Sequence, residues 1–94
     1  MYIYVIYKAK PGRRAEFLSR VEELHLPQQI RQEDGCLCYN YYLSHQDADE
    51  ILLVESWETP EKQKIHMQQP HMKTLLAIKN DCILESRLGH LTVE

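Results

Sequence analysis

The pattern of apolar and polar positions divides the chain into alternating strands and helices. Residues 2–7 are aromatic or β-branched and precede a Lys-Pro-Gly turn at 10–12, which predicts a first strand. Across 13–26 apolar residues recur every three or four positions, which predicts an amphipathic helix. A proline at the start of 27–33 predicts a kink and a second helical piece, ended by the Asp-Gly pair at 34–35.

The second half of the chain repeats this alternation. Residues 36–43 and 51–57 predict two strands joined by a polar hairpin loop, and both strands carry apolar side chains on both faces. The hydroxyl and proline at the start of 59–68 predict a short helix, and Pro70 begins another. Alternation returns over 81–92, which predicts a fourth strand.

The order strand, helix, strand, strand, helix, strand is typical of the α+β class. It predicts a ferredoxin-like split β-α-β-β-α-β arrangement, in which helices cover one face of an antiparallel sheet. Residues 1–94 are expected to form a single domain. Because the strands are apolar on both sides, the other face of the sheet needs a cover, and we expect a second copy to supply it in a homodimeric α/β barrel.

Composition excludes several classes of partner. The net charge is −3 and the basic residues form no stripe, so nucleic-acid binding is not expected. The longest apolar stretches are far shorter than a membrane span, and the start lacks the features of a signal peptide. We therefore expect a soluble, cytoplasmic protein that does not bind membranes.

The cysteines are expected to be reduced thiols. They are odd in number, and Cys36 and Cys38 lie two apart on a predicted strand, the wrong geometry for an easy disulfide. These two with His66 and His71 would make a four-ligand zinc set. Their spacing is not that of a metal knuckle, so no metal is expected.

Three residues give the strongest indication of a site. Trp57 ends an apolar strand, His66 follows nine residues later, and His71 comes directly after Pro70. This spacing runs from a strand end, through one short helix, to the start of another, so we expect the indole and both imidazoles to converge on one pocket. Each residue also has a plainer interpretation: Trp57 as core, His66 as a surface residue, His71 as a capping or packing residue.

Four further residues are candidates for lining that pocket. Tyr39 and Tyr41 lie on one predicted strand and Glu55 on its neighbour. A carboxylate among apolar strand residues needs a partner, so Glu55 is expected to pair with a basic residue or to orient a histidine. His25 lies beside the apolar stripe of the first helix, where a core-edge position is the alternative.

Together these motifs resemble the antibiotic biosynthesis monooxygenase (ABM) family over nearly the whole chain. The matching segments are Lys10-Pro11-Gly12, Glu33-Asp34-Gly35-Cys36 with Tyr39, Glu55-Ser56-Trp57-Glu58, His66, and Pro70-His71-Met72-Lys73. The resemblance, nearest to the quinol monooxygenase branch, implies a homodimeric barrel that oxygenates quinols or aromatic polyketides without flavin, haem or metal. It places Trp57, His66 and His71 in the family's pocket motif, with Tyr39 and Glu55 as pocket wall or supporting positions.

The implied chemistry is simple. A deprotonated phenol or quinol reacts with dioxygen directly, so the protein need only bind the ring, remove a proton and stabilise the anion. His66 would be the general base, with His71 or a tyrosine as hydrogen-bond donor.

The same resemblance includes proteins with other activities. Haem-degrading members use an Asn, a Trp and an axial His where this chain has Val5, His66 and Leu76, so haem degradation is not expected. Isomerases of a phosphorylated autoinducer sugar share the last motif and a His-Leu pair like His25-Leu26. The longer helix-to-strand spacing and Trp57 favour the quinol branch. A non-catalytic small-molecule binding module is the third alternative, because the fold hosts many functions.

Overall fold

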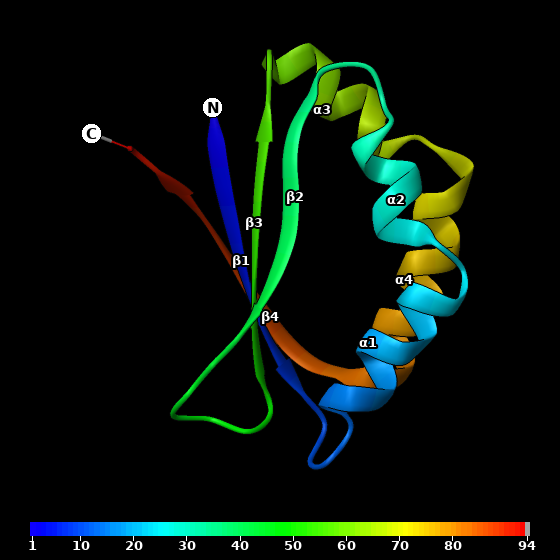
Figure 1. The fold of residues 1–94 in the computed structure, drawn as a ribbon, viewed down its shortest axis with the longest axis vertical. Coiled ribbons are helices and arrows are strands. Elements are labelled where there is room, and N and C mark those ends of the chain that lie inside the picture. The colour runs from blue at the N-terminus through cyan, green and yellow to red at the C-terminus, as the bar shows by residue number, and fades with distance from the viewer. Residues whose placement is uncertain (94) are drawn as a thin grey trace.

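The computed structural model describes residues 1–93. The helices and strands are β1 (Tyr2–Ala9), α1 (Arg14–Glu23), α2 (Leu26–Arg31), β2 (Cys36–Leu43), β3 (Glu50–Trp57), α3 (Pro60–Met67), α4 (Pro70–Cys82) and β4 (Ile83–Leu91). The strands form one sheet in the order β2-β3-β1-β4, and every neighbouring pair is antiparallel. All helices lie on one side of this sheet (Figure 1). The predicted α+β ferredoxin-like architecture is confirmed.

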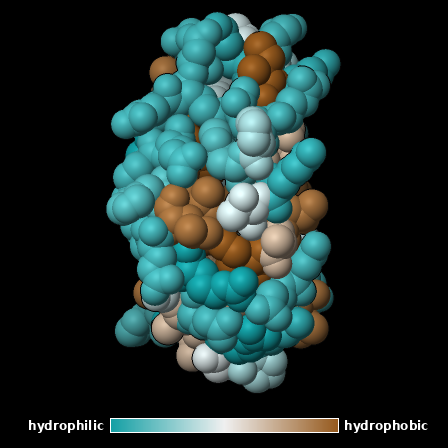
Figure 2. Space-filling view, turned by 90° about the vertical axis from the view of Figure 1, so that its right-hand side faces the viewer, coloured by the Kyte–Doolittle hydropathy of each residue, from teal (hydrophilic) through white to brown (hydrophobic). Residues whose placement is uncertain are grey.

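The core lies between the helical layer and the inner face of the sheet. Along β1 every second residue, from Ile3 through Val5 to Tyr7, is buried, as expected for a strand with one covered face. Helix α1 contributes Phe17 and Val21, which are fully buried. Figure 2 faces the helical layer and shows a mostly hydrophilic surface with a few apolar side chains grouped near its middle.

Two predicted boundaries differ from the structure. The break between α1 and α2 falls at His25, whose φ of 54° is in the left-handed region, so Pro27 lies inside the first turn of α2 and does not mark the kink itself. The fourth strand begins at Ile83, because α4 continues through Asp81 and Cys82. Cys82 extends the buried stripe of Leu75 and Ile78, and Arg13 donates to the Asp81 carbonyl at 2.7 Å, so packing against α1 keeps these residues helical.

Gly35 fixes the loop between α2 and β2. Its φ is 87°, and a Cβ there would lie 2.6 Å from Cγ of Lys62. Any other residue would therefore be strained and would collide with α3. This loop carries Glu33, which becomes important below.

The outer face of the sheet is apolar although no helix covers it. Tyr4, Ile6, Leu52 and Val54 are half-buried there and pair across β1 and β3, and Tyr42 of β2 is exposed beside them. An uncovered apolar sheet face is a typical interaction surface. Separately, none of the helices within residues 1–93 is both long and apolar enough to cross a membrane.

We propose that a second copy of the chain covers this outer face. Leu52→Lys is expected to weaken self-association by about a hundredfold, because it places an unpaired charge in the contact. Light scattering at micromolar concentration measures the mass directly. Leu76→Lys, at an exposed position on α4, is the matched control and should leave a dimer intact. A monomeric unmodified protein would contradict the proposal.

Candidate active site

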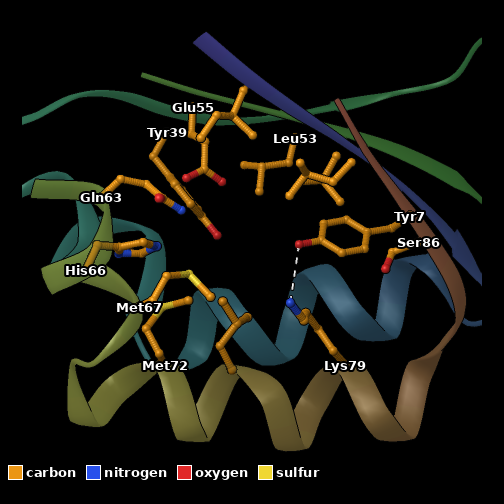
Figure 3. A pocket seen from close by; sticks show the side chains of 14 residues that line it. Tyr7, Tyr39, Leu53, Glu55, Gln63, His66, Met67, Met72, Lys79 and Ser86 are labelled. Carbon is orange, nitrogen blue, oxygen red and sulfur yellow. Dashed lines mark hydrogen bonds between the residues drawn. The ribbon is translucent and has the colours of Figure 1, made fainter. Parts of the chain in front are cut away.

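A cavity of about 160 Å³ lies between the inner face of the sheet and helices α3 and α4 (Figure 3). Its walls are largely apolar and come from both layers: Ile3, Val5 and Leu53 from the sheet, and Met67, Met72 and Leu75 from the helices. Polar side chains reach it at separate points: Tyr7, Tyr39, Glu55, Gln63, His66, Lys79 and Ser86. A largely apolar pocket with a few polar groups is the usual form of a small-molecule site.

His66 is buried in the wall of this cavity. Thr59 caps α3 by accepting a hydrogen bond from the Lys62 amide at 3.1 Å, and Pro60 occupies the first turn. Starting the helix there turns His66, two turns later, toward the sheet, where its side chain is 1% exposed. The Trp57 indole packs against the imidazole with ring centroids 4.5 Å apart and planes inclined by 31°. The indole therefore restricts the orientation of the ring.

Glu33 holds His66 from the side away from the cavity. Its carboxylate lies 2.9 Å from Nδ1 of His66 and 2.8 Å from Nε2 of His71, and both contacts use Oε2. The Glu33 side chain is 10% exposed. A carboxylate accepts, so each imidazole donates an N–H to it. We call Glu33, His66 and His71 the carboxylate triad.

The triad determines which nitrogen of His66 is available. The hydrogen bonds of this ring within residues 1–93 all involve Nδ1, and no fully buried side-chain nitrogen or oxygen in that part of the chain lacks a partner. Nε2 has no partner, so it must be accessible, and the space beside His66 is the cavity. A neutral ring that donates from Nδ1 carries its lone pair on Nε2. His66 is therefore arranged as a proton acceptor for a molecule in the cavity.

Trp57 and Glu55 form a second buried contact next to His66. The indole Nε1 donates to Oε1 of Glu55 at 2.8 Å, and the Glu55 carboxylate faces the cavity (Figure 3). The prediction that Glu55 pairs with a basic residue or orients a histidine was wrong. The indole N–H supplies the hydrogen bond that the Glu55 carboxylate needs, because Trp57 follows two residues later on the same strand and points to the same face.

The structure brings only some of the predicted site residues to the cavity. His66, Tyr39 and Glu55 line it, whereas Trp57 lies behind His66. Tyr41 supports Tyr39 through a contact between the two hydroxyls of 3.3 Å. The expectation that both imidazoles face one pocket was wrong: the ring of His71 turns to Glu33 instead. His25 is exposed between α1 and α2 and lines no part of this cavity.

The hydroxyl groups around the cavity are neutral donors. Burial raises the pKa of Tyr39 well above its ordinary value and raises that of Tyr41 to about 12. Burial also raises the pKa of Tyr7 and lowers the pKa of the Lys79 ammonium. The site therefore offers neutral O–H groups and one poorly solvated cation to a bound molecule.

The triad atoms lie within 4.8 Å of one another, close enough to surround a divalent cation. The arrangement is nevertheless that of a hydrogen-bonded cluster. Within residues 1–93 the second ring nitrogen of each histidine has no protein acceptor, which metal-binding histidines ordinarily have. A second acidic set, Glu16 with Asp81 and Cys82, is neutralised by arginines. Cys36 and Cys38, the other members of the four-ligand set that the sequence did not favour, lie on β2 and belong to neither cluster, and burial raises the pKa of Cys36 to about 11.

Sequence reasoning missed three important residues. Glu33 entered the sequence analysis only as part of a family motif, and no role was predicted for it. A buried carboxylate in a loop needs a hydrogen-bond partner. Tyr7 continues the inward alternation of Ile3 and Val5. Lys79 lies four residues after Leu75, on the stripe that faces the sheet. Tyr7 and Lys79 could have been predicted by continuing the strand alternation and the helical stripe to the polar residues that share the same face.

The chain belongs to the antibiotic biosynthesis monooxygenase family, whose model matches residues 1–77. Three solved structures share the fold. PA3566 from Pseudomonas aeruginosa is 22% identical, with a TM-score of 0.82 over 99% of this chain and 92% of that chain. An antibiotic biosynthesis monooxygenase is 20% identical, with a TM-score of 0.84 over 99% of this chain and 97% of that chain. A conserved protein from Bacteroides thetaiotaomicron is 20% identical, with a TM-score of 0.83 over 96% of this chain and 93% of that chain. These identities establish similarity of fold alone. The chain has no significant match among curated proteins.

Glu33→Ala is expected to lower the free energy of unfolding by about 2–3 kcal/mol, because it leaves the N–H groups of the buried His66 and the half-buried His71 unpaired. Urea denaturation measures the change. Asp34→Ala, next to it on the exposed surface, is the matched control and should cost less than about 1 kcal/mol, since the Asp34 ion pair with Lys62 is solvated. Equal losses from the two variants would show that the triad does not stabilise the fold.

Proposed function

We propose that this protein is a cofactor-independent monooxygenase that acts on a small phenol or quinol with dioxygen, using His66 as general base. The single observation that carries the proposal is the buried imidazole, held by Glu33 at Nδ1 and free at Nε2 beside a partly open cavity. The size of the cavity supports a compact substrate, since an apolar cavity of about 150 Å³ accommodates benzene. Family membership supports oxygenation as the type of reaction.

The first step is a proton transfer. The substrate hydroxyl gives its proton to Nε2 of His66, and the resulting imidazolium remains hydrogen-bonded to the Glu33 carboxylate. An adjacent carboxylate stabilises this cation, and the stacked indole keeps the ring in place. The electron-rich phenolate that remains is the species that reacts with oxygen.

The second step needs no electrons from the protein. The phenolate transfers one electron to dioxygen, and the superoxide and phenoxyl radical combine to form a carbon–oxygen bond at a ring carbon bearing hydrogen. The imidazolium returns its proton to the peroxide. Cleavage of the oxygen–oxygen bond with loss of the ring hydrogen then releases water and leaves a carbonyl, so one oxygen atom enters the quinone product and the other leaves in water.

The hydroxyl groups that line the cavity suit a phenolate. Neutral hydroxyls such as that of Tyr39 donate to a developing negative charge, and their high pKa values keep the proton on the tyrosine. The same lining disfavours a phosphorylated sugar. Glu55 would repel a phosphate dianion, and of the described residues lining the cavity only Lys79 is a permanent cation.

His66→Gln is expected to reduce turnover by about two to four orders of magnitude, because it removes the general base while nearly preserving volume. Oxygen consumption with hydroquinone and with menadiol, corrected for their spontaneous oxidation, measures the rate. His45→Gln, in the exposed hairpin loop, is the matched control and should retain full activity.

The same assay tests the division of roles between the histidines. His71→Gln is expected to cost much less than His66→Gln, since His71 does not line the cavity and contacts the base only indirectly, through Glu33. A larger loss from His71→Gln would reverse the assignment. Tight binding of these ligands with no oxygen uptake above background would indicate a binding module in place of an enzyme.

A further inference from the structure

The two ends of the cavity carry different chemistry. His66, Gln63 and Glu55 lie at one end, whereas Tyr7, Lys79 and Ser86 lie at the other (Figure 3). The walls between them are the apolar side chains and the ring of Tyr39. The proposed proton transfer uses the first end and leaves the second without a role.

Tyr7 and Lys79 are joined at that second end. Nζ of Lys79 donates to the Tyr7 hydroxyl oxygen at 3.5 Å and lies 5.3 Å from the centre of the ring. Because the hydroxyl accepts this bond, its own hydrogen is free to donate. Within residues 1–93 neither group has a hydrogen bond to a carboxylate or carbonyl. The Tyr7 O–H and the other N–H groups of the Lys79 ammonium therefore have no protein acceptor, and both side chains line the cavity.

We propose that Tyr7 and Lys79 form a second anchor that binds an oxygen substituent of the substrate. The ionising hydroxyl lies at His66 and the second oxygen lies across the ring from it, so the cavity selects flat rings with oxygen atoms on opposite sides. This inference rests on the proposed function for the identity of the first end. Tyr7 and Lys79 are then residues that determine specificity.

The charges around the cavity favour this assignment. Burial removes water from the Lys79 ammonium, which lowers its pKa, and the Glu55 carboxylate is the anion facing it from across the cavity. A poorly solvated ammonium gains most from an additional oxygen acceptor. Tyr7 is buried and neutral, so it adds a directional donor. A substrate oxygen at this position would accept a hydrogen bond from both Tyr7 and Lys79.

A pair of isomeric ligands tests the geometry. The probes are 4-nitrophenol, whose nitro oxygens lie opposite the hydroxyl, and 2-nitrophenol, whose nitro group lies beside it. The isomers have similar size and acidity, so a difference in affinity reports the position of the second oxygen. The visible absorbance of the nitrophenolate, taken as the difference between bound and free ligand at the same pH, also reports, without turnover, whether the bound hydroxyl has lost its proton.

Lys79→Met is expected to weaken binding of 4-nitrophenol by about ten- to hundredfold and that of 2-nitrophenol by less than about twofold, the size expected for a charged hydrogen bond. Tyr7→Phe should weaken 4-nitrophenol alone by about three- to tenfold. Lys64→Met, on the exposed surface of α3, is the matched control and should change neither affinity. Thermal unfolding of each variant verifies that the fold is retained.

The outcomes separate the anchor from the proposed function. Equal effects of Lys79→Met and Tyr7→Phe on the two isomers, or no binding of 4-nitrophenol to the unmodified protein, would overturn the anchor. A selective loss of 4-nitrophenol affinity without any phenolate absorbance would support the anchor and contradict His66 as the base. His66→Gln should abolish the phenolate absorbance while the isomer preference persists.

Discussion

The shared carboxylate of Glu33 is the constraint on which the site depends. It joins a loop after α2 to the end of α3 and the start of α4, whose histidines lie 33 and 38 residues further along the chain. A nearly buried carboxylate is costly unless it is hydrogen-bonded, and here two imidazoles supply the donors. The positive φ of Gly35 lets the loop place Glu33 there. The same bond that stabilises the fold also leaves Nε2 of His66 as the free nitrogen.

The chemistry is concentrated at the two ends of one small cavity. Trp57 contributes twice: its ring face supports His66 and its N–H satisfies Glu55. This arrangement keeps a carboxylate in the cavity wall without an adjacent cation. The proposed anchor at Tyr7 and Lys79 binds a second substrate oxygen at the opposite end. The two ends together would select a substrate by the positions of its oxygen atoms.

The order of the elements could be predicted because strand alternation and helical stripes are local properties. The start of β4 could not, because Cys82 fits either a strand or the buried stripe of α4 and packing against α1 decides between them. The proximity of Trp57 and His66 followed from the cap at Thr59, which fixes the phase of α3. The direction of His71 depends on where Glu33 lies, and Glu33 lies in a loop whose path is set by tertiary contacts. Sequence periodicity carries no information about such a contact.

The tautomer of His66 tests the account most directly. Nitrogen-15 NMR of the histidine side chains, recorded where the rings are neutral, distinguishes a proton on Nδ1 from one on Nε2. The account predicts that His66 is protonated at Nδ1 and that Glu33→Ala abolishes this preference. A His66 ring protonated at Nε2 in the unmodified protein would have no lone pair facing the cavity and would contradict its role as the base.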